Sequence, residues 1–161
     1  MIHTAIKRLS KKDVPQIWQL NEDGLPWVGK VSETEIESLL EYSTLALGAF
    51  DGKSLHGFVI CLPPKTEYSS LNYAWFEQRY DDFVYVDRIA ISSQHRGFGI
   101  GAQIYSKVIE SAEEKGVPVL AEVMKSPMNE ASMHFHSAFG FVEVGTLVHE
   151  KYTVSMLYRE A

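Results

Sequence analysis

The sequence of 161 residues contains one cysteine and no long apolar run, and both features limit the class of protein that it can encode. Cys61 is the only cysteine, so a disulfide framework is excluded. Its place in the apolar run 55–62 predicts a buried, inert thiol. No stretch has the apolar length of a signal peptide or a bilayer span. We therefore expect a cytoplasmic protein without a membrane partner.

Basic residues are not in excess either, because the formal net charge is −6 at pH 7. This balance disfavours binding to nucleic acid and mildly favours cationic partners such as amines. An anionic ligand would need a local binding site. With 45% hydrophobic and 22% charged residues and no low-complexity segment, the composition is that of a globular protein. The length predicts a single domain, residues 1–161.

The order of the expected elements predicts a mixed α/β fold in which strands dominate both ends of the chain. The expected strands are 4–9, 44–50, 55–62, 83–91, 117–123, 141–148 and 152–158. The expected helices are 11–20, 32–42, 100–115 and 129–139. The pair Asp51-Gly52 predicts a hairpin turn, and Ser32 with Glu35 forms a capping box. Segment 65–82 is rich in aromatic residues without clean periodicity, so we expect an irregular insertion.

A glycine-rich turn at residues 96–101, with the sequence Arg-Gly-Phe-Gly-Ile-Gly, lies between an expected strand and an expected helix. Glycines allow a tight turn and a close approach of the backbone to a ligand, and the helix N-terminus attracts anions. Arg96 adds a forked cation. The turn therefore predicts a site for a pyrophosphate, although a simple chain reversal is the alternative.

Two other phosphate-binding families use similar turns. A Walker loop needs Lys-Ser/Thr after its last glycine, and Ala102-Gln103 stands there, so this family is excluded. The dinucleotide pattern Gly-x-Gly-x-x-Ala fits better, with Glu122 in the place of a ribose-binding acid. Too little chain follows for a doubly wound sheet, and the preceding elements resemble an antiparallel hairpin. A dinucleotide-binding protein is therefore the weaker alternative.

The turn also matches the pattern Arg/Gln-x-x-Gly-x-Gly/Ala through Arg96, Gly99 and Gly101. A second pattern follows further along the chain: Asn129-x-x-Ser132-x-x-Phe135-His136-x-x-x-Gly140-Phe141. Together, in this order and separation, the two patterns resemble the GNAT acetyltransferase superfamily. Within it the chain is similar to a bacterial group of predicted acetyltransferases that carry Phe-His in place of Phe-Tyr.

This resemblance implies a strongly twisted mixed sheet of about seven strands with about four helices. The sheet would splay between its fourth and fifth strands and hold acetyl-CoA in the split. The pantetheine arm would lie along the fourth strand, and the turn would hold the pyrophosphate. The implied cofactor-binding residues are Ile89, Ala90, Ile91, Arg96, Gly97, Phe98, Gly99, Ile100, Gly101, Asn129, Ser132 and Phe135. No metal is expected, because His134 and His136 project about 200° apart on a helix.

The resemblance also implies an acetyl-CoA-dependent N-acetyltransferase that acetylates a primary amine of a small molecule or peptide by direct transfer. An alkyl ammonium has a pKa of about 10.4, so a base must remove its proton. Asp87 and Glu122 are the candidate bases, with structural ion pairing as the alternative. Strand alternation predicts Asp87 on one face with Tyr85, Ile89 and Ile91. His136, in place of the family's tyrosine, is the candidate proton donor to the leaving thiolate, or else a packing residue.

Aromatic side chains are the candidates for the acceptor site. Tyr73, Trp75 and Phe76 of the insertion, with Trp27 of the early loop, offer rigid surface and cation–π contact for an ammonium. The alternative is that they pack beneath a long loop. The edges of the terminal hairpin suggest a homodimer. A non-catalytic acyl-CoA-binding module is the remaining alternative function.

Overall fold

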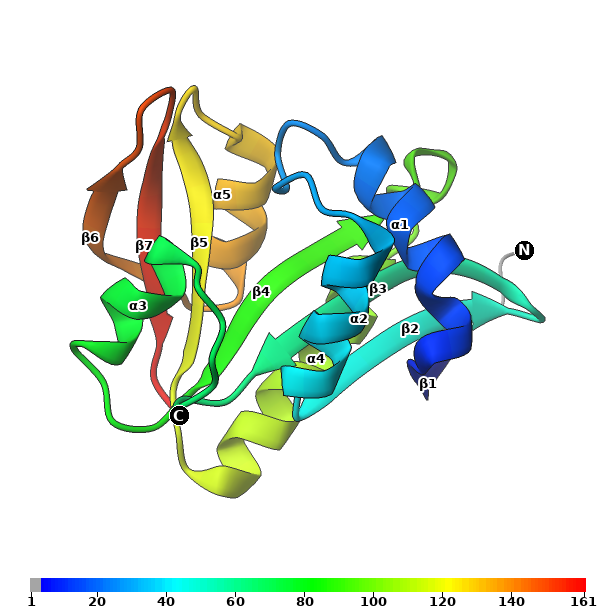
Figure 1. Ribbon diagram of the computed structural model, residues 1–161, viewed down its shortest axis with the longest axis horizontal. Coiled ribbons are helices and arrows are strands. Elements are labelled where there is room, and N and C mark those ends of the chain that lie inside the picture. The colour runs from blue at the N-terminus through cyan, green and yellow to red at the C-terminus, as the bar shows by residue number, and fades with distance from the viewer. Residues whose placement is uncertain (1–3) are drawn as a thin grey trace.

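A computed structural model describes residues 4–161, and its centre is one seven-stranded sheet in the order β1-β2-β3-β4-β5-β7-β6 (Figure 1). The strands are β1 Ala5–Arg8, β2 Leu45–Asp51, β3 Ser54–Leu62, β4 Val84–Ile91, β5 Val119–Ser126, β6 Val142–Val148 and β7 Thr153–Arg159. Every predicted strand is present, so the predicted mixed α/β class is confirmed.

Five α-helices and two short 3-10 helices complete the described residues. They are η1 Lys11–Asp13, α1 Val14–Asp23, α2 Glu33–Tyr42, α3 Leu71–Glu77, η2 Ser93–His95, α4 Ile100–Lys115 and α5 Glu130–Ala138. The predicted capping box opens α2, since Ser32 Oγ accepts from Glu35 N and Glu35 Oε1 accepts from Ser32 N, both at 3.1 Å. Across residues 4–161, no helix has both the length and the apolar character to cross a bilayer.

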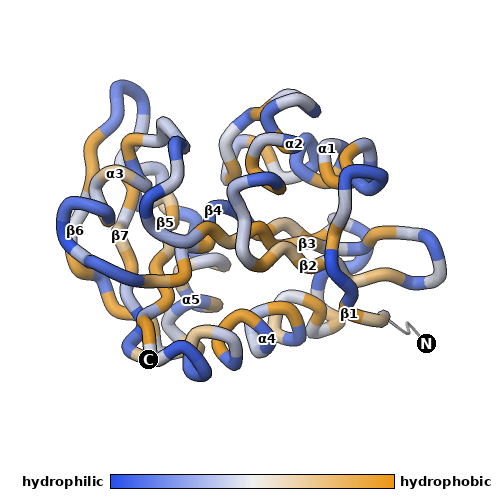
Figure 2. The backbone as a smooth tube through the Cα atoms, turned by 60° about the horizontal axis from the view of Figure 1, so that its bottom comes forward, coloured by the Kyte–Doolittle hydropathy of each residue, from blue (hydrophilic) through white to orange (hydrophobic). Residues whose placement is uncertain are grey.

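The helices cover both faces of the sheet, which gives two apolar cores. Figure 2 shows α1 and α2 on one side of β2 and β3, and α4 on the other. Ile17, Ile36 and Phe76 belong to the core beneath α1, α2 and α3. Ile104 and Tyr105 belong to the core beneath α4. A sheet buried on both faces explains the nearly continuous apolar runs of its central strands.

The sheet is split in its middle. All neighbouring strands are antiparallel except β4 and β5, which are parallel and pair only through Val84↔Val119 and Tyr85↔Leu120. Beyond these two pairs the strands diverge, as Figure 1 shows. The implied splay between strands four and five is confirmed. A doubly wound dinucleotide fold would need a largely parallel sheet, so that alternative is excluded.

A β-bulge at Asp87 corrects the predicted face alternation of β4. Ile60 pairs with Arg88 and Cys61 with Val86, which leaves Asp87 as the extra residue. Tyr85 therefore packs in the core of α1–α3, whereas Ile89 and Ile91 pack against the core of α4. The prediction that all three share a face was wrong, because a bulge resets the two-residue period.

The insertion 65–82 contains a helix that the sequence did not predict. Helix α3 spans only seven residues, too few for a helical period to show in the pattern. Ser70 caps it, since its Oγ accepts a 3.3 Å hydrogen bond from Tyr73 N. The helix lies beside the β5–β7–β6 half of the sheet (Figure 1).

Candidate active site

The unpaired edge of β4 and the glycine turn lie next to each other along the chain. From Val86 to Ile91, no described strand pairs with β4 on its β5 side. Gly97 and Gly99 have φ values of +84° and +79°, and a Cβ at either would meet no atom within 4 Å. Gly99 is also the N-cap of α4. The turn thus presents open space at a helix N-terminus, which suits an anion.

The two sequence patterns are in contact in the structure. A Cβ on Gly101 would lie 3.3 Å from Cε1 of Phe135, so the start of α4 packs directly against α5. Asn129 caps α5, because its Oδ1 accepts a 3.2 Å hydrogen bond from Ser132 N. The segments 96–101 and 129–141, which are separate in the sequence, therefore contact each other in the fold.

The other residues of the turn differ in the exposure of their side chains. Phe98 is 62% exposed, whereas the Ile100 side chain is buried in the core beneath α4. Arg96 is exposed and donates from Nε to the carbonyl of Ile91 at 3.3 Å. Arg96 and Phe98 offer side chains to a ligand, and Ile100 offers only its backbone.

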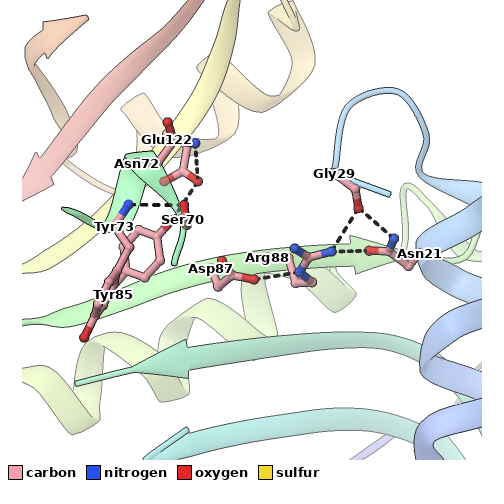
Figure 3. Close-up of polar contacts among 9 residues, drawn as sticks. All are labelled: Asn21, Gly29, Ser70, Asn72, Tyr73, Tyr85, Asp87, Arg88 and Glu122. Atoms are coloured by element: carbon pink, nitrogen blue, oxygen red, sulfur yellow. Dashed lines mark hydrogen bonds and ion pairs between the residues drawn. The ribbon is translucent and has the colours of Figure 1, made fainter. Parts of the chain in front are cut away.

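Glu122 is the carboxylate with the most unusual surroundings. Its Oε1 accepts a 2.7 Å hydrogen bond from the Tyr85 hydroxyl and a 3.1 Å hydrogen bond from Asn72 Nδ2 (Figure 3). Its Oε2 is shielded from solvent and has no hydrogen-bond partner among the described residues. Burial, and next the nearby carboxylate of Asp87, raises the pKa of Glu122 to about 8. Such a carboxyl group exchanges its proton near neutral pH.

Asp87, the other candidate base, is engaged by its neighbour. Arg88 Nε donates to Asp87 Oδ2 at 2.7 Å, and the two side chains are 6% and 3% exposed. Arg88 Nη1 also donates to Asn21 Oδ1 and to the Gly29 carbonyl, each at 3.0 Å (Figure 3). The bulge brings these consecutive side chains together, and Arg88 ties β4 to the loop after α1. Removing Asp87 would leave a buried cation without its partner.

His136 is buried, and both of its ring nitrogens are occupied. Nδ1 lies 2.8 Å from the Ser132 carbonyl and Nε2 lies 2.6 Å from the Tyr105 hydroxyl. A carbonyl only accepts, so Nδ1 carries the proton and Nε2 accepts from Tyr105. Burial lowers the pKa of His136, which keeps the ring neutral. Its single N–H is used inside the protein, so protonation of a leaving thiolate would need a rearranged ring and stays a prediction.

The aromatic candidates occupy different places. Tyr73 and Phe76 are fully buried and pack edge-on against Tyr85 and Trp75 respectively. The ring of Trp75 lies over Gly145, where a Cβ would come within 2.5 Å of Cζ2. Trp27 lies in the loop after α1 and is 43% exposed. Of the four candidates, Trp27 alone is exposed, and Trp75 is partly buried.

Asn72, Tyr85 and His149 belong to the Glu122 site, and the sequence analysis gave none of them a role. His149 Nε2 lies 2.8 Å from Asn72 Oδ1, which extends the Glu122 network to the turn after β6. These residues are 37 to 77 positions apart from their partners, so no local pattern connects them. Within residues 4–161, no three histidine, cysteine or acidic side chains are grouped to hold a metal ion.

Comparison with known proteins gives the class. The model of the Acetyltransferase (GNAT) family matches residues 14–141, so the chain belongs to this family. The resemblance drawn from the two sequence patterns is confirmed, and the enzyme class, N-acetyltransferase, is confirmed at the level of the family.

The sequence identity to an individual relative is low. The L-amino acid N-acyltransferase MnaT of Escherichia coli (strain K12) is 28% identical over 101 residues, 58% of this chain and 55% of that protein. The match thus spans about half of that relative's length.

Solved structures show the same fold at low identity. The ribosomal-protein-S18-alanine N-acetyltransferase of Escherichia coli has a TM-score of 0.77 at 16% identity, over 98% of this chain and 94% of that chain. YncA of Salmonella typhimurium, solved with its cofactor acetyl-CoA, has a TM-score of 0.73 at 15% identity, over 98% and 94%.

Proposed function

We propose that the chain, as one domain over residues 1–161, is an acetyl-CoA-dependent N-acetyltransferase that acetylates a primary amine of a small molecule or peptide by direct transfer. The observation that carries the proposal is Glu122, a shielded carboxyl group with a pKa raised to about 8, on β5 beside the split. Family membership and the relative solved with acetyl-CoA support the cosubstrate.

The residues along the split fit a phosphate-bearing thioester. The unpaired backbone of Ile89–Ile91 would hold the pantetheine arm as an added strand. The turn 96–101 has the open space, the helix N-terminus and the arginine that a pyrophosphate needs. Asn129, Ser132 and Phe135 would flank the turn from α5. Acetyl-CoA, when bound, supplies an activated acetyl group as a thioester.

Glu122 then acts as the base. Its carboxylate takes one proton from the acceptor ammonium and so becomes a carboxylic acid, while the nitrogen regains its lone pair. The nitrogen forms a bond to the acetyl carbon while the bond from carbon to sulfur breaks. A second proton passes from the nitrogen to the thiolate sulfur, so the products are the amide and the free thiol of CoA. An ordinary thiol has a pKa near 8.5, so the thiolate leaves readily near this pH.

The pKa of Glu122 favours one kind of amine. A base of pKa about 8 matches an α-ammonium, whose pKa is about 7.7–8.0, better than a lysine-type ammonium near 10.4. Two of the relatives are named for α-amines, an L-amino acid and the alanine of a ribosomal protein. We therefore propose the α-amino group of an amino acid or peptide as the acceptor. Trp27 would contact its side chain.

Isothermal titration of acetyl-CoA and of NADH into the purified protein tests the cosubstrate. We expect binding of acetyl-CoA alone, and preference for NADH would contradict the proposal. Thiol release is then measured with amino acids, short peptides and ε-amine analogues, and we expect α-amines to react fastest. Tight binding of acetyl-CoA without transfer to any amine would instead identify a non-catalytic acyl-CoA-binding module.

A further inference from the structure

The side chain of Asn72 connects three parts of the molecule. Asn72 lies on α3, its Nδ2 donates to Glu122 Oε1 of β5 at 3.1 Å, and its Oδ1 lies 2.8 Å from His149 Nε2. His149 follows β6, and its ring stacks on Tyr152 with a centroid distance of 4.6 Å. The Glu122 carboxylate is thus linked through one amide to the β6–β7 turn.

The two contacts fix the orientation of the amide. The amide oxygen of Asn72 only accepts, so His149 must carry its proton on Nε2 and donate it. The NH₂ group is then directed at Glu122. If His149 could not donate, only the contact with Glu122 would orient the amide, and a flipped amide would direct its oxygen at the carboxylate.

The result is a carboxylate with two different oxygens. Oε1 accepts from both Asn72 and Tyr85, and Tyr85 keeps its proton because burial raises its pKa. Oε2 has no partner among the described residues. A proton that arrives at this carboxylate therefore meets only one oxygen with free lone pairs.

We propose that His149 is a positioning residue which, through Asn72, saturates Glu122 Oε1 with donors and makes Oε2 the atom that takes the acceptor proton. This role rests on the proposed function, in which Glu122 is the base. It adds the β6–β7 turn to the machinery of proton transfer.

The anchoring of α3 supports this role. Trp75, one helical turn from Asn72, packs so closely on Gly145 of β6 that a Cβ there would lie 2.5 Å from the indole. Helix α3 therefore contacts the β6–β7 hairpin through Trp75 as well as through Asn72. Two contacts on the same hairpin hold the amide at a fixed distance from β5.

The other charged groups around Glu122 come from β4. Asp87 raises the pKa of Glu122 and Arg88 lowers it, while Tyr85 and Asn72 lower it by hydrogen bonding to the ionised form. Tyr68 lies near Asp87 and Arg88. Substitution of His149 leaves all of these groups in place and removes the donor behind Asn72 together with the stacking contact on Tyr152.

The test is a ¹³C NMR titration of the glutamate carboxyl groups in the ligand-free protein, with Glu122→Gln assigning the resonance. Loss of a donor to the ionised form raises a carboxyl pKa. We expect Asn72→Leu to raise the midpoint of Glu122 by about one pH unit, and His149→Leu to raise it by a smaller amount. His149→Gln, which keeps a donor, should restore the wild-type value. His134→Leu, which removes an exposed histidine of α5, is the matched control.

Kinetics complete the test. The pH midpoint of kcat should move with the NMR midpoint in each variant, while the Kd of acetyl-CoA stays unchanged. An unchanged NMR midpoint in His149→Leu would overturn the proposal and leave His149 as a hairpin contact. The NMR midpoint could move while wild type and Glu122→Gln have the same pH profile of kcat. In that case Glu122 is not the base, and the proposed function fails instead.

Discussion

The two sides of the split between β4 and β5 are built in different ways. The side that we assign to the cosubstrate consists of three short segments, residues 89–91 of β4, the turn 96–101 and helix α5, with Phe135 against Gly101. The opposite side collects Glu122, Asn72 and His149 from three elements, with Tyr85 of β4 donating to Glu122. In the proposed function, acetyl-CoA binds segments that short sequence patterns identify, whereas the acceptor amine meets a network of residues that are distant in sequence.

Substitutions on the two sides should therefore affect different steps of the reaction. Changes in the turn should affect acetyl-CoA affinity alone. Changes in the Glu122 network should affect turnover and its pH dependence while the cosubstrate still binds.

The largest expected effect is that of Glu122→Gln. Without the base, kcat should fall by about 10²–10⁴-fold, the usual contribution of a general base. The Kd of acetyl-CoA, measured by titration, should stay within about twofold of wild type. Glu143→Gln, on the exposed strand β6, is the control. Turnover near the wild-type rate in Glu122→Gln would break the assignment of the two sides.

Stability should depend on pH through the same residue. The folded chain keeps the Glu122 proton up to about pH 8, whereas the unfolded chain releases it near 4.5. The folded state therefore binds more protons in this window, and its free energy of unfolding falls as pH rises. Glu122→Gln should avoid this loss and gain up to a few kcal/mol over wild type by pH 8, since one pKa unit is about 1.4 kcal/mol.

Urea unfolding between pH 5 and pH 9 measures this effect. Glu143→Gln should keep the wild-type trend, because Glu122 is still present and because hydrogen bonds from Lys125 and Ser155 lower the pKa of Glu143 and place its titration below this window. Parallel curves for wild type and Glu122→Gln would show that Glu122 titrates normally.

On the cosubstrate side, Gly99→Val should weaken acetyl-CoA binding by about tenfold or more, the equivalent of 1.4 kcal/mol. The new side chain would fill the open space at the N-terminus of α4 and strain a φ of +79°. Gly52→Val is the matched control, since Gly52 also has a positive φ, +60°, and open surroundings but lies in the β2–β3 turn. Equal losses of affinity in both variants would indicate a general folding defect.

Gly145→Ala tests whether the contact between α3 and β6 matters for the acceptor side. The methyl group must displace Trp75, at a cost of about 1–3 kcal/mol in unfolding free energy. The acceptor KM should rise while the Kd of acetyl-CoA does not. Adding Trp75→Leu removes the clash and should recover most of the lost stability. A fully stable Gly145→Ala variant would mean that α3 is not anchored on β6.

His136→Phe should have the smallest effect on turnover, under about tenfold, because both ring nitrogens already serve Ser132 and Tyr105. Leaving these groups unpaired should cost about 1–3 kcal/mol of stability. A fall in kcat of a hundredfold or more, with native stability and unchanged acetyl-CoA affinity, would instead support the role of His136 as proton donor.

Most of the fold was predictable because its signals are local. Runs of strand-forming residues and turn pairs predicted every strand, and the family patterns predicted the split. Helix α3 was missed because seven residues carry no period, and the bulge at Asp87 was missed because nothing in the residue pattern shows the register of β3.

The candidate site was predictable only in part, because most of its contacts join residues that are distant in sequence. Glu122 was identified as a carboxylate within an apolar strand. Its partners Asn72 and Tyr85 are polar residues whose role depends on strands and helices distant in sequence, 50 and 37 positions away. His149 likewise lies 77 positions from its partner Asn72.

The junction of β4 and β5 has a further consequence. In the part of the chain that the structure describes, two residue pairs join the β1–β4 and β5–β7 halves of the sheet, whereas β3 and β4 share six. Hydrogen bonding across the middle of the molecule is thus sparser than within either half, and local opening should begin there. A ligand that pairs with the exposed edge of β4 would bridge the two halves. Binding of such a ligand would then also hold the two halves of the enzyme together.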